Sequence, residues 1–214
     1  MINAVFLFKA PTPILGLANP FQSTDQGVAT WFHERLTPAF AGVLHTVTEF
    51  GSGEWIGIVV AALVLFFMWK RWWAPLVTVI VAVPCGMLLN ELVKLAVHRH
   101  RPFVDGPFVD WSGYSFASGH TMGATLLYGQ LLLFVLPLLK TRHWRLICIF
   151  SAASLVLLVG FTRIALGAHF LTDVLAAIFF GIIWLMLCAV LGKSVRRRTV
   201  ASAVSISHSA ELEH

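Results

Sequence analysis

The sequence predicts an all-α protein, a bundle of transmembrane helices with five clear spans, for two reasons. First, 58% of the 214 residues are hydrophobic and only 12% are charged, whereas a soluble domain has about 25% charged residues. Second, the mean hydropathy is +0.82, and the apolar residues form runs near the length of about 20 residues that crosses a bilayer. The length suits one compact bundle and leaves no room for a second folded domain.

Five apolar runs are the predicted spans. They cover residues 55–69, 74–97, 121–139, 144–166 and 171–191. The first is short and is expected to begin near Gly51, at a tight turn. In the second, Pro84 and Gly86 predict a kink, because proline removes one helical hydrogen bond. A membrane protein tolerates such a kink where a neighbouring helix covers the freed carbonyl group.

The chain is predicted to divide into three segments. Residues 1–50 form an N-terminal segment, residues 51–192 form the transmembrane bundle, and residues 193–214 form a basic cytoplasmic tail. The tail ends in ELEH, which resembles the remnant of an expression tag, so no function is assigned to His208 or His214.

The N-terminal segment is the least regular part of the sequence. Residues 1–21 contain Lys9, Pro11 and Pro13, which weaken them as a span, so a kinked sixth span and an interfacial segment both remain open. They lack the basic start and the cleavage site of a clear signal peptide. Apolar residues in 26–49 recur every three or four positions, which predicts an amphipathic helix lying on the membrane.

Basic residues in the short loops predict the orientation. KRWW at 70–73, KTRHWR at 140–145 and KSVRRR at 193–198 fall on the same side when the spans alternate. The positive-inside rule makes that side cytoplasmic, so we expect a multi-pass protein of the inner membrane. The net charge of +5 suits an anionic partner. Because the bases lie at the ends of apolar runs, membrane lipid is favoured over nucleic acid.

Three polar clusters interrupt the apolar sequence, all on the face opposite the basic loops. The first is ELVKLAVHRHRPF, which closes the second span. We expect the helix to continue to Pro102, so that Lys94 and Arg101, seven residues apart, share one face. A lysine and an arginine pointing the same way suit a phosphate group. Snorkelling of both side chains to lipid headgroups is the alternative.

The other charged residues near this cluster are expected to play supporting roles. His98, Arg99 and His100 would fall on other faces of the helix end, as headgroup contacts or substrate-entry residues. Glu91 lies one turn before Lys94 and could pair with it. The loop that follows, FVDGPFVDWSGYSF, is a candidate cover for the site.

The second cluster is FASGH, just before the third span. Ser118 and Gly119 at a helix start offer a hydroxyl and free backbone N–H groups, which form an anion site. His120 follows in the first turn and could deliver a proton. The alternative is a helix-capping serine beside an interfacial histidine.

The third cluster is TRIALGAHFLTD, between the fourth and fifth spans. Arg163 ends one span and His169 opens the next, with Asp173 four residues later on the same helical face. A carboxylate there can bind one imidazole nitrogen and leave the lone pair of the other free. A purely structural His–Asp pair is the alternative. Three cations, two histidines, an aspartate, a serine and a glycine thus converge on one membrane face.

These motifs resemble a known family. K-x6-R-P, S-G-H and R-x5-H-x3-D, in this order, resemble the type 2 phosphatidic acid phosphatase superfamily of membrane lipid phosphatases, over about residues 45–190. Two departures are visible: Ala117 stands where the second motif usually has proline, and Thr162 stands where the third often has serine. Neither change removes a functional side chain, although loss of the proline could loosen the loop before Ser118.

The resemblance implies a mechanism. His169 would attack phosphorus and form a phosphohistidine, Asp173 would orient the imidazole, and His120 would protonate the departing lipid oxygen and then activate water. The phosphate oxygens would be held by Lys94, Arg101, Ser118, the Gly119 N–H and Arg163. Phosphoryl transfer needs positive charge around these oxygens. The three cations could supply it, and no carboxylate cluster suited to magnesium is evident, so we expect no metal or other cofactor.

The leading hypothesis is a metal-independent phosphatase of lipid phosphates or diphosphates whose active site faces the periplasm. Phosphatidylglycerophosphate, undecaprenyl diphosphate, phosphatidic acid and a lipid A phosphate are all compatible substrates. Two alternatives stay open: a lipid phosphotransferase with the same phosphoenzyme, and a non-catalytic lipid-binding or transport protein. The intact Arg163, His169 and Asp173 weigh against the second. The motifs specify neither the lipid nor the oligomeric state.

Overall fold

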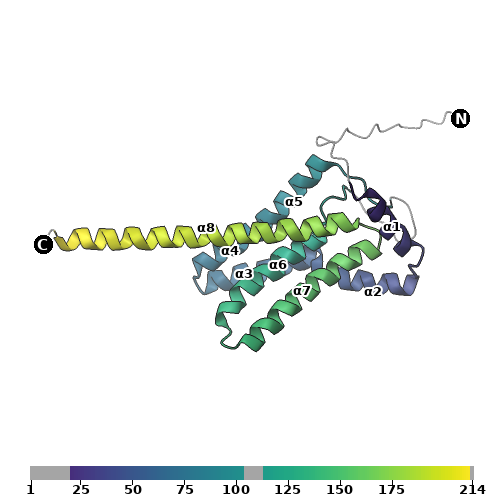
Figure 1. Cartoon of the computed structure of the whole chain (residues 1–214). Coiled ribbons are helices and arrows are strands. Elements are labelled where there is room, and N and C mark those ends of the chain that lie inside the picture. Colours follow the sequence, from purple (N-terminus) through teal and green to yellow (C-terminus); the bar gives the residue numbers. More distant parts are fainter. Residues whose placement is uncertain (1–19, 104–112, 213–214) are drawn as a thin grey trace.

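The computed structural model describes residues 20–103 and 113–212, with side-chain surroundings given as far as residue 194. Every regular element in these ranges is helical (Figure 1), which confirms the predicted all-α class. The helices are α1 (Gln22–His33), α2 (Pro38–Thr48), η1 (Glu49–Gly51), α3 (Gly53–Trp69), α4 (Trp73–Ala82), α5 (Pro84–Val97), α6 (Gly119–Val135), η2 (Leu136–Leu138), α7 (Arg142–Ala165) and α8 (Leu171–Leu212). The open question of an N-terminal span falls on residues 1–19, and the end of the tag-like tail on residues 213–214, both outside the described ranges.

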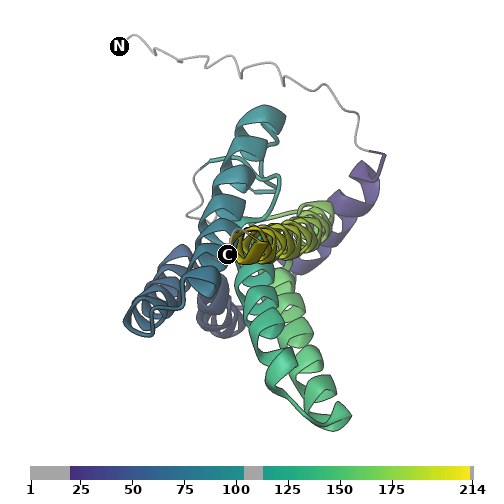
Figure 2. The same cartoon turned by 90° about the vertical axis from the view of Figure 1, so that its left-hand side faces the viewer.

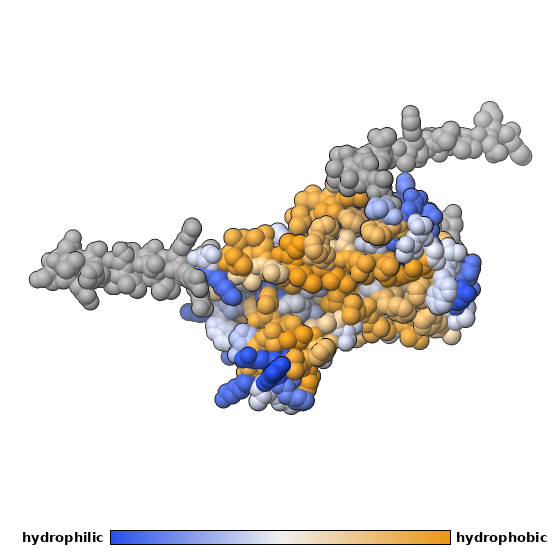
Figure 3. Space-filling view, in the orientation of Figure 1, coloured by the Kyte–Doolittle hydropathy of each residue, from blue (hydrophilic) through white to orange (hydrophobic). Residues whose placement is uncertain are grey.

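The predicted number of five spans is confirmed within the described part of the chain, although the first begins at Pro38 and not near Gly51. The helical segments long and apolar enough to cross a membrane are Pro38–Trp69, Trp73–Val97, Gly119–Leu138, Arg142–Ala165 and Leu171–Ser194. Their surface is hydrophobic in Figure 3, whereas hydrophilic residues gather beside α1 at one end and at the α6–α7 loop at the other. In Figure 2, where α8 points toward the viewer, the other long helices spread around it.

Helix α6 lies at the centre of the bundle, packed against α3, α5, α7 and α8. Its buried side chains Met122, Leu126 and Leu127 form one core cluster with Val83 and with Ala177 of α8. In a membrane such close packing gains mainly van der Waals contact, since lipid tails are as apolar as leucine. The central position of α6 fixes its N-terminus, which carries the second polar cluster.

The kink predicted in the second span is confirmed. The span divides at Val83 into α4 and α5, and Pro84 is the first residue of α5. The indole N–H of Trp184 on α8 lies 3.0 Å from the carbonyl oxygen of Ala82 and 3.3 Å from that of Val81. A neighbouring helix therefore satisfies carbonyl groups beside the kink, as a membrane interior requires.

The predicted extension of this helix to Pro102 is wrong. Helix α5 ends at Val97, and His98 adopts a left-handed conformation with φ 53°. The N–H of His98 closes the last turn onto the carbonyl of Lys94 at 3.0 Å, and its ring lies edge-on to Tyr114 at 4.5 Å. Arg101 is thus in a loop, and the shared helical face was not a valid argument for placing it near Lys94.

The single amphipathic helix predicted over residues 26–49 is also wrong, because the structure has two helices there. Helix α1 ends at His33 and α2 begins at Pro38. Proline favours the first helical position and disfavours a helical residue before it. The Thr37 side chain accepts the N–H of Phe40 at 3.3 Å and caps α2. Helix α1 packs against α7 and α8, and α2 packs against α7.

Candidate active site

A short turn between α7 and α8 positions His169. The carbonyl group of Arg163 accepts the backbone N–H groups of Ala168 at 3.0 Å and His169 at 3.2 Å. Gly167 has φ +70°, and a Cβ atom there would lie 2.8 Å from the Phe103 ring. Both the backbone conformation and the contact favour glycine at this position. The turn therefore holds His169 rigidly just before the first turn of α8.

The Nδ1 atom of His169 faces Asp173 and Ser115. It lies 3.8 Å from Asp173 Oδ2, which is too long for a hydrogen bond, and 3.4 Å from Ser115 Oγ. Ser115 Oγ in turn donates to Asp173 Oδ2 at 2.5 Å. All three side chains are buried. Ser115 thus lies between the imidazole and the carboxylate, a role that the sequence did not reveal.

The Nε2 atom of His169 faces Arg101. The Nη1 atom of Arg101 lies 3.3 Å from Nε2 and donates to the carbonyl oxygen of Ala168 at 3.0 Å. A guanidinium can only donate hydrogen bonds, so the ring nitrogen that it faces carries the lone pair. The hydrogen is then on Nδ1, toward Asp173. Both sides of the ring favour the tautomer that a nucleophile at Nε2 requires.

Burial is the main reason that the pKa of His169 falls to about 4, because desolvation disfavours the charged imidazolium. The neighbouring charges of Arg163 and Arg101 lower this pKa further, while Asp173 opposes the shift. At neutral pH the imidazole is therefore uncharged. Burial likewise lowers the pKa of Arg101 from its ordinary value, and the Asp173 carboxylate again opposes the shift.

The N-terminus of α6 lies against the first turn of α8. Ser118 caps α6: its hydroxyl accepts hydrogen bonds from the backbone N–H of Thr121 at 3.5 Å and from the Thr121 hydroxyl at 3.0 Å. The N–H of Ser118 donates to the Asp173 carbonyl oxygen at 3.2 Å. Gly119 is the first residue of α6, where a backbone N–H has no partner within the helix. The capping role left open for Ser118 is thus present, beside an N-terminus suited to an anion.

Lys94 reaches the same helix end from the last turn of α5. Its Nζ atom lies 3.3 Å from the point where a Cβ atom on Gly119 would stand, and it pairs with Glu91 at 2.7 Å. This contact bears out the pairing suggested for Glu91. Asn90, one turn earlier, is buried, and its Nδ2 atom lies 3.8 Å from the position of that same Cβ atom on Gly119. Asn90 was missed, although its spacing of four residues from Lys94 could have indicated it.

Arg163 and His120 complete the cluster. Arg163 is 2% exposed and donates from Nη1 to Thr48 Oγ1 at 3.3 Å. His120, half-buried in the first turn of α6, is within electrostatic range of four of the predicted residues: Arg163, His169, Lys94 and Arg101. The structure thus brings all the predicted site residues to one end of the bundle. Within the described residues, no group of three His, Cys, Asp or Glu side chains is arranged to hold a metal ion.

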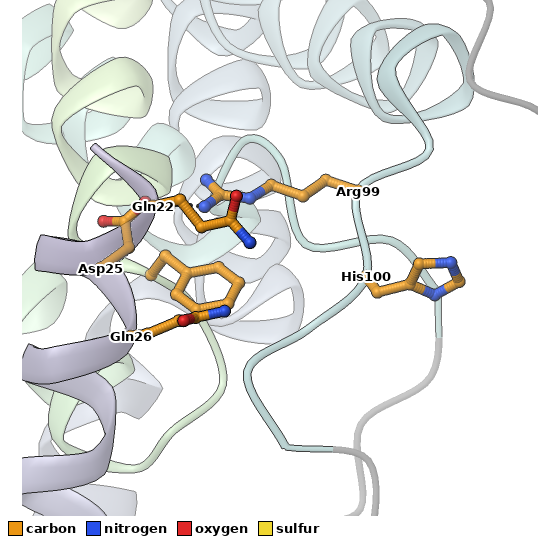
Figure 4. A pocket seen from close by; sticks show the side chains of 6 residues that line it. Gln22, Asp25, Gln26, Arg99 and His100 are labelled. Atoms are coloured by element: carbon orange, nitrogen blue, oxygen red, sulfur yellow. Dashed lines mark hydrogen bonds and ion pairs between the residues drawn. The ribbon is translucent and has the colours of Figure 1, made fainter. Parts of the chain in front are cut away.

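Arg99 was predicted to contact lipid headgroups or to lie at the substrate entry, but it binds two carboxylates inside the protein. Its Nη1 atom donates to Asp173 Oδ1 at 2.5 Å, and its Nη2 atom donates to Asp25 Oδ2 at 2.7 Å. The left-handed turn at His98 redirects the chain and makes these contacts reachable. Figure 4 shows Arg99 extending toward Asp25 and Gln22 on α1, beside a cavity of about 170 Å³.

Comparisons with known proteins identify the family of the chain. The family model of the PAP2 superfamily matches residues 75–197 of the chain. Phosphatidylglycerophosphatase B of Bacillus subtilis is 30% identical over 199 residues, which are 91% of this chain and 96% of that protein. Lipid A 4'-phosphatase of Porphyromonas gingivalis is 27% identical over 150 residues, 62% of this chain and 59% of that one.

A solved structure is similar as well. The crystal structure of a transmembrane PAP2-type phosphatidylglycerolphosphate phosphatase from Bacillus subtilis has a TM-score of 0.73 and 26% sequence identity. The similarity covers 83% of this chain and 89% of that one. The resemblance drawn from three short motifs therefore extends to the arrangement of most of the helical bundle.

Proposed function

The chain belongs to the PAP2 superfamily and is a multi-pass membrane phosphatase of the lipid-phosphate type, and from this premise we propose that it acts without a metal, through a phosphohistidine on His169. The observation that carries the proposal is the state of His169. Its Nε2 lone pair faces Arg101, its Nδ1 side faces Ser115 and Asp173, and its pKa of about 4 leaves it neutral at pH 7.

In the first step, Nε2 of His169 attacks phosphorus, the N–P bond forms and the bond from phosphorus to the lipid oxygen breaks. Protonated His120 gives its proton to that oxygen, which leaves as the lipid alcohol. In the second step, His120 takes a proton from water, the water oxygen attacks phosphorus, and the N–P bond breaks. Inorganic phosphate leaves, and both histidines return to their starting states.

The charge on the transferring group is balanced by Lys94, Arg101 and Arg163. Each has contacts that hold it in place: Glu91 for the lysine, the Ala168 carbonyl group for Arg101, and Thr48 for Arg163. Positive groups held in place before the reaction stabilise a phosphoryl transition state without reorganisation at the moment of transfer. Ser118 and the Gly119 N–H add hydrogen-bond donors at the start of α6.

A lipid substrate is supported by the surface around this site. Leu88, Leu92 and Leu95 lie on the outward face of α5 and are 62%, 55% and 57% exposed, while Lys94 in the same helix turns inward to the site. Membrane lipid can therefore approach along α5 with its phosphate at the level of Lys94. Phosphatidylglycerophosphate is our first candidate substrate, because the relative similar over 91% of the chain is named for it.

We place the site on the periplasmic face of the inner membrane. The support is the opposite end of the bundle, where Lys70 and Arg71 follow α3 and Lys140 follows η2. Two more basic residues, Arg142 and Arg145, lie in the first turn of α7 at the same end. Positively charged loops favour the cytoplasmic side. A cysteine placed at an end of the bundle in intact cells would test this orientation by its access to an impermeant thiol reagent.

The substrate test is phosphate release in detergent with EDTA present. The panel is phosphatidylglycerophosphate, undecaprenyl diphosphate, phosphatidic acid and a lipid A phosphate, offered to wild type, His169→Ala and His143→Ala. His143 is an exposed histidine at the opposite end of the bundle and serves as the matched control. We expect EDTA-resistant release by wild type and by His143→Ala but not by His169→Ala. Loss of release with EDTA would contradict the metal-independent mechanism, and release only in the presence of an acceptor lipid would indicate a transferase.

A further inference from the structure

Arg99 lies between two buried carboxylates. It donates to Asp173 at 2.5 Å and to Asp25 at 2.7 Å, and these carboxylate side chains are 0% and 1% exposed. A third donor contact reaches the hydroxyl of Thr172 at 2.7 Å. Its guanidinium also covers the ring of Phe170 at 4.2 Å. Arg99 therefore touches the residue directly after His169 and the carboxylate four residues after it.

Asp25 comes from a different part of the chain and binds the same turn. Its Oδ1 atom accepts the backbone N–H of Thr172 at 3.0 Å, and its Oδ2 atom accepts the Thr172 hydroxyl at 2.5 Å. Asp25 therefore caps the N-terminus of α8 from α1, where the helix dipole favours a negative charge. The same carboxylate fixes the guanidinium of Arg99 from the other side.

The contacts of Asp173 show what this arrangement does. Its Oδ2 atom accepts hydrogen bonds from Ser115 at 2.5 Å and from the Phe170 N–H at 2.9 Å, and its Oδ1 atom accepts from Arg99. These contacts leave little freedom for the carboxylate that faces Nδ1 of His169. A planar guanidinium can hold two carboxylates in fixed directions, which a lysine cannot.

We propose that Asp25 and Arg99 form a positioning pair, which holds Asp173 and through it keeps His169 in the orientation needed to attack phosphorus. In this account α1 is a structural part of the catalytic machinery and not only a helix at the membrane surface. The pair touches neither the substrate nor the reacting atoms. The inference deepens the proposed function, on which it rests for its reaction.

The test compares Arg99→Met, Arg99→Lys and Asp25→Asn with the surface pair variants Arg35→Met and Glu34→Gln. Arg35 and Glu34 form an exposed ion pair just after α1 and serve as matched controls. We expect Arg99→Met to lower kcat by about 10–100-fold, taking as a guide the range seen for hydrogen-bonded partners of metal-binding histidines, with KM within about twofold of wild type. Arg99→Lys should recover part of the loss, and Asp25→Asn should show a smaller loss in kcat.

Two further readouts separate positioning from a structural role. Thermal unfolding in detergent identifies variants that fail to fold, and the rate of phosphoenzyme formation in a single turnover measures the step that His169 performs. Slower phosphoenzyme formation in a folded Arg99→Met protein supports the positioning role of the Asp25–Arg99 pair. Formation at the wild-type rate, or a loss that appears only in KM, would overturn it. If wild type itself releases no phosphate from any lipid, the proposed function fails instead.

A second inference rests on a separate observation, the buried amide of Asn90. Asn90 is 3% exposed, and its Nδ2 atom has no hydrogen-bond partner within the described part of the chain. A buried donor left in this state costs free energy unless a ligand satisfies it. Nδ2 lies beside the Gly119 end of α6, where the Nζ atom of Lys94 is also placed. The geometry points to Asn90 as a further donor to a phosphate oxygen.

Inhibition by inorganic vanadate, measured on phosphate release from the preferred lipid, tests this assignment with a ligand that has no lipid tail. We expect Asn90→Ala to weaken vanadate inhibition of the residual activity by about tenfold, which corresponds to the loss of one hydrogen bond. Asn90→Asp, which keeps the shape and adds a negative charge, should weaken it further. Unchanged inhibition in both folded variants would overturn the role of Asn90. The control is Gln130→Ala, a buried amide deeper in α6.

Discussion

Acidification tests the state of His169 directly. With a pKa of about 4, about 97% of the imidazole stays neutral at pH 5.5, whereas an ordinary histidine with a pKa near 6.5 would be only about 9% neutral. The two cases differ by about tenfold in the fraction of competent nucleophile. The difference arises from desolvation in the buried turn and from the charges of Arg163 and Arg101.

The same shift links the protonation of His169 to stability. The folded state binds its proton at a lower pH than the unfolded state, so the unfolded chain holds more protons between about pH 6.5 and 4. Stability is therefore fully present above about pH 6.5 and is lost as the pH falls toward the folded pKa. The loss amounts to about 3 kcal/mol, at 1.36 kcal/mol per pKa unit.

NMR titration of histidine-labelled protein in detergent is the assay, with His169 assigned by the signal missing from His169→Gln. We expect a midpoint near 4 for this imidazole. The midpoint of thermal unfolding should fall between pH 6.5 and 4 more steeply in wild type than in His169→Gln. A midpoint near the ordinary value of about 6.5 would refute the claim that the turn keeps His169 buried and neutral.

Two further predictions concern Gly119 at the start of α6 and Trp184 beside the kink between α4 and α5. Gly119→Ala places a Cβ atom 3.3 Å from the Nζ atom of Lys94. Because the flexible end of the lysine can shift, we expect a near-normal midpoint of thermal unfolding. The displaced Lys94 should lower kcat/KM for the preferred lipid by about tenfold. Wild-type kinetics would show that Lys94 is not needed at that position. Trp184→Phe removes the indole donor to the Ala82 carbonyl at 3.0 Å, and an unsatisfied carbonyl in the bundle costs about 1–3 kcal/mol. The midpoint of thermal unfolding should fall by several degrees while kcat per folded molecule stays close to wild type, and an unchanged midpoint would contradict the role of Trp184 at the kink.

The spans and the break at Pro84 could be predicted from the sequence because their causes are local. A run of about 20 apolar residues has the length that crosses a bilayer, and Pro84 acts on the carbonyl groups within one turn of itself. The break before Pro38 is local too, since Thr37-Pro38 combines a capping residue with a first-position proline. The periodicity of the neighbouring apolar residues concealed it.

The environment of Asp173 could not be predicted, because it depends on contacts between residues far apart in the chain. Asp25 and Arg99 are 74 residues apart, and Ser115 is 58 residues before Asp173. A left-handed histidine at position 98 is unusual, and no local signal marks it. Long-range pairs of this kind are set by how α1, the loop after α5 and α8 pack together, which hydropathy and motif spacing do not encode.

The central claim, that His169 carries the phosphoryl group, is tested most directly by trapping the intermediate. Lipid labelled in its phosphate group is mixed with enzyme in detergent and EDTA, the reaction is quenched in alkali within milliseconds, and label bound to protein is counted and mapped. We predict that wild type carries an alkali-stable, acid-labile label on the peptide containing His169, and that His169→Ala carries none. Label on another residue, or hydrolysis by His169→Ala at the wild-type rate, would contradict the account.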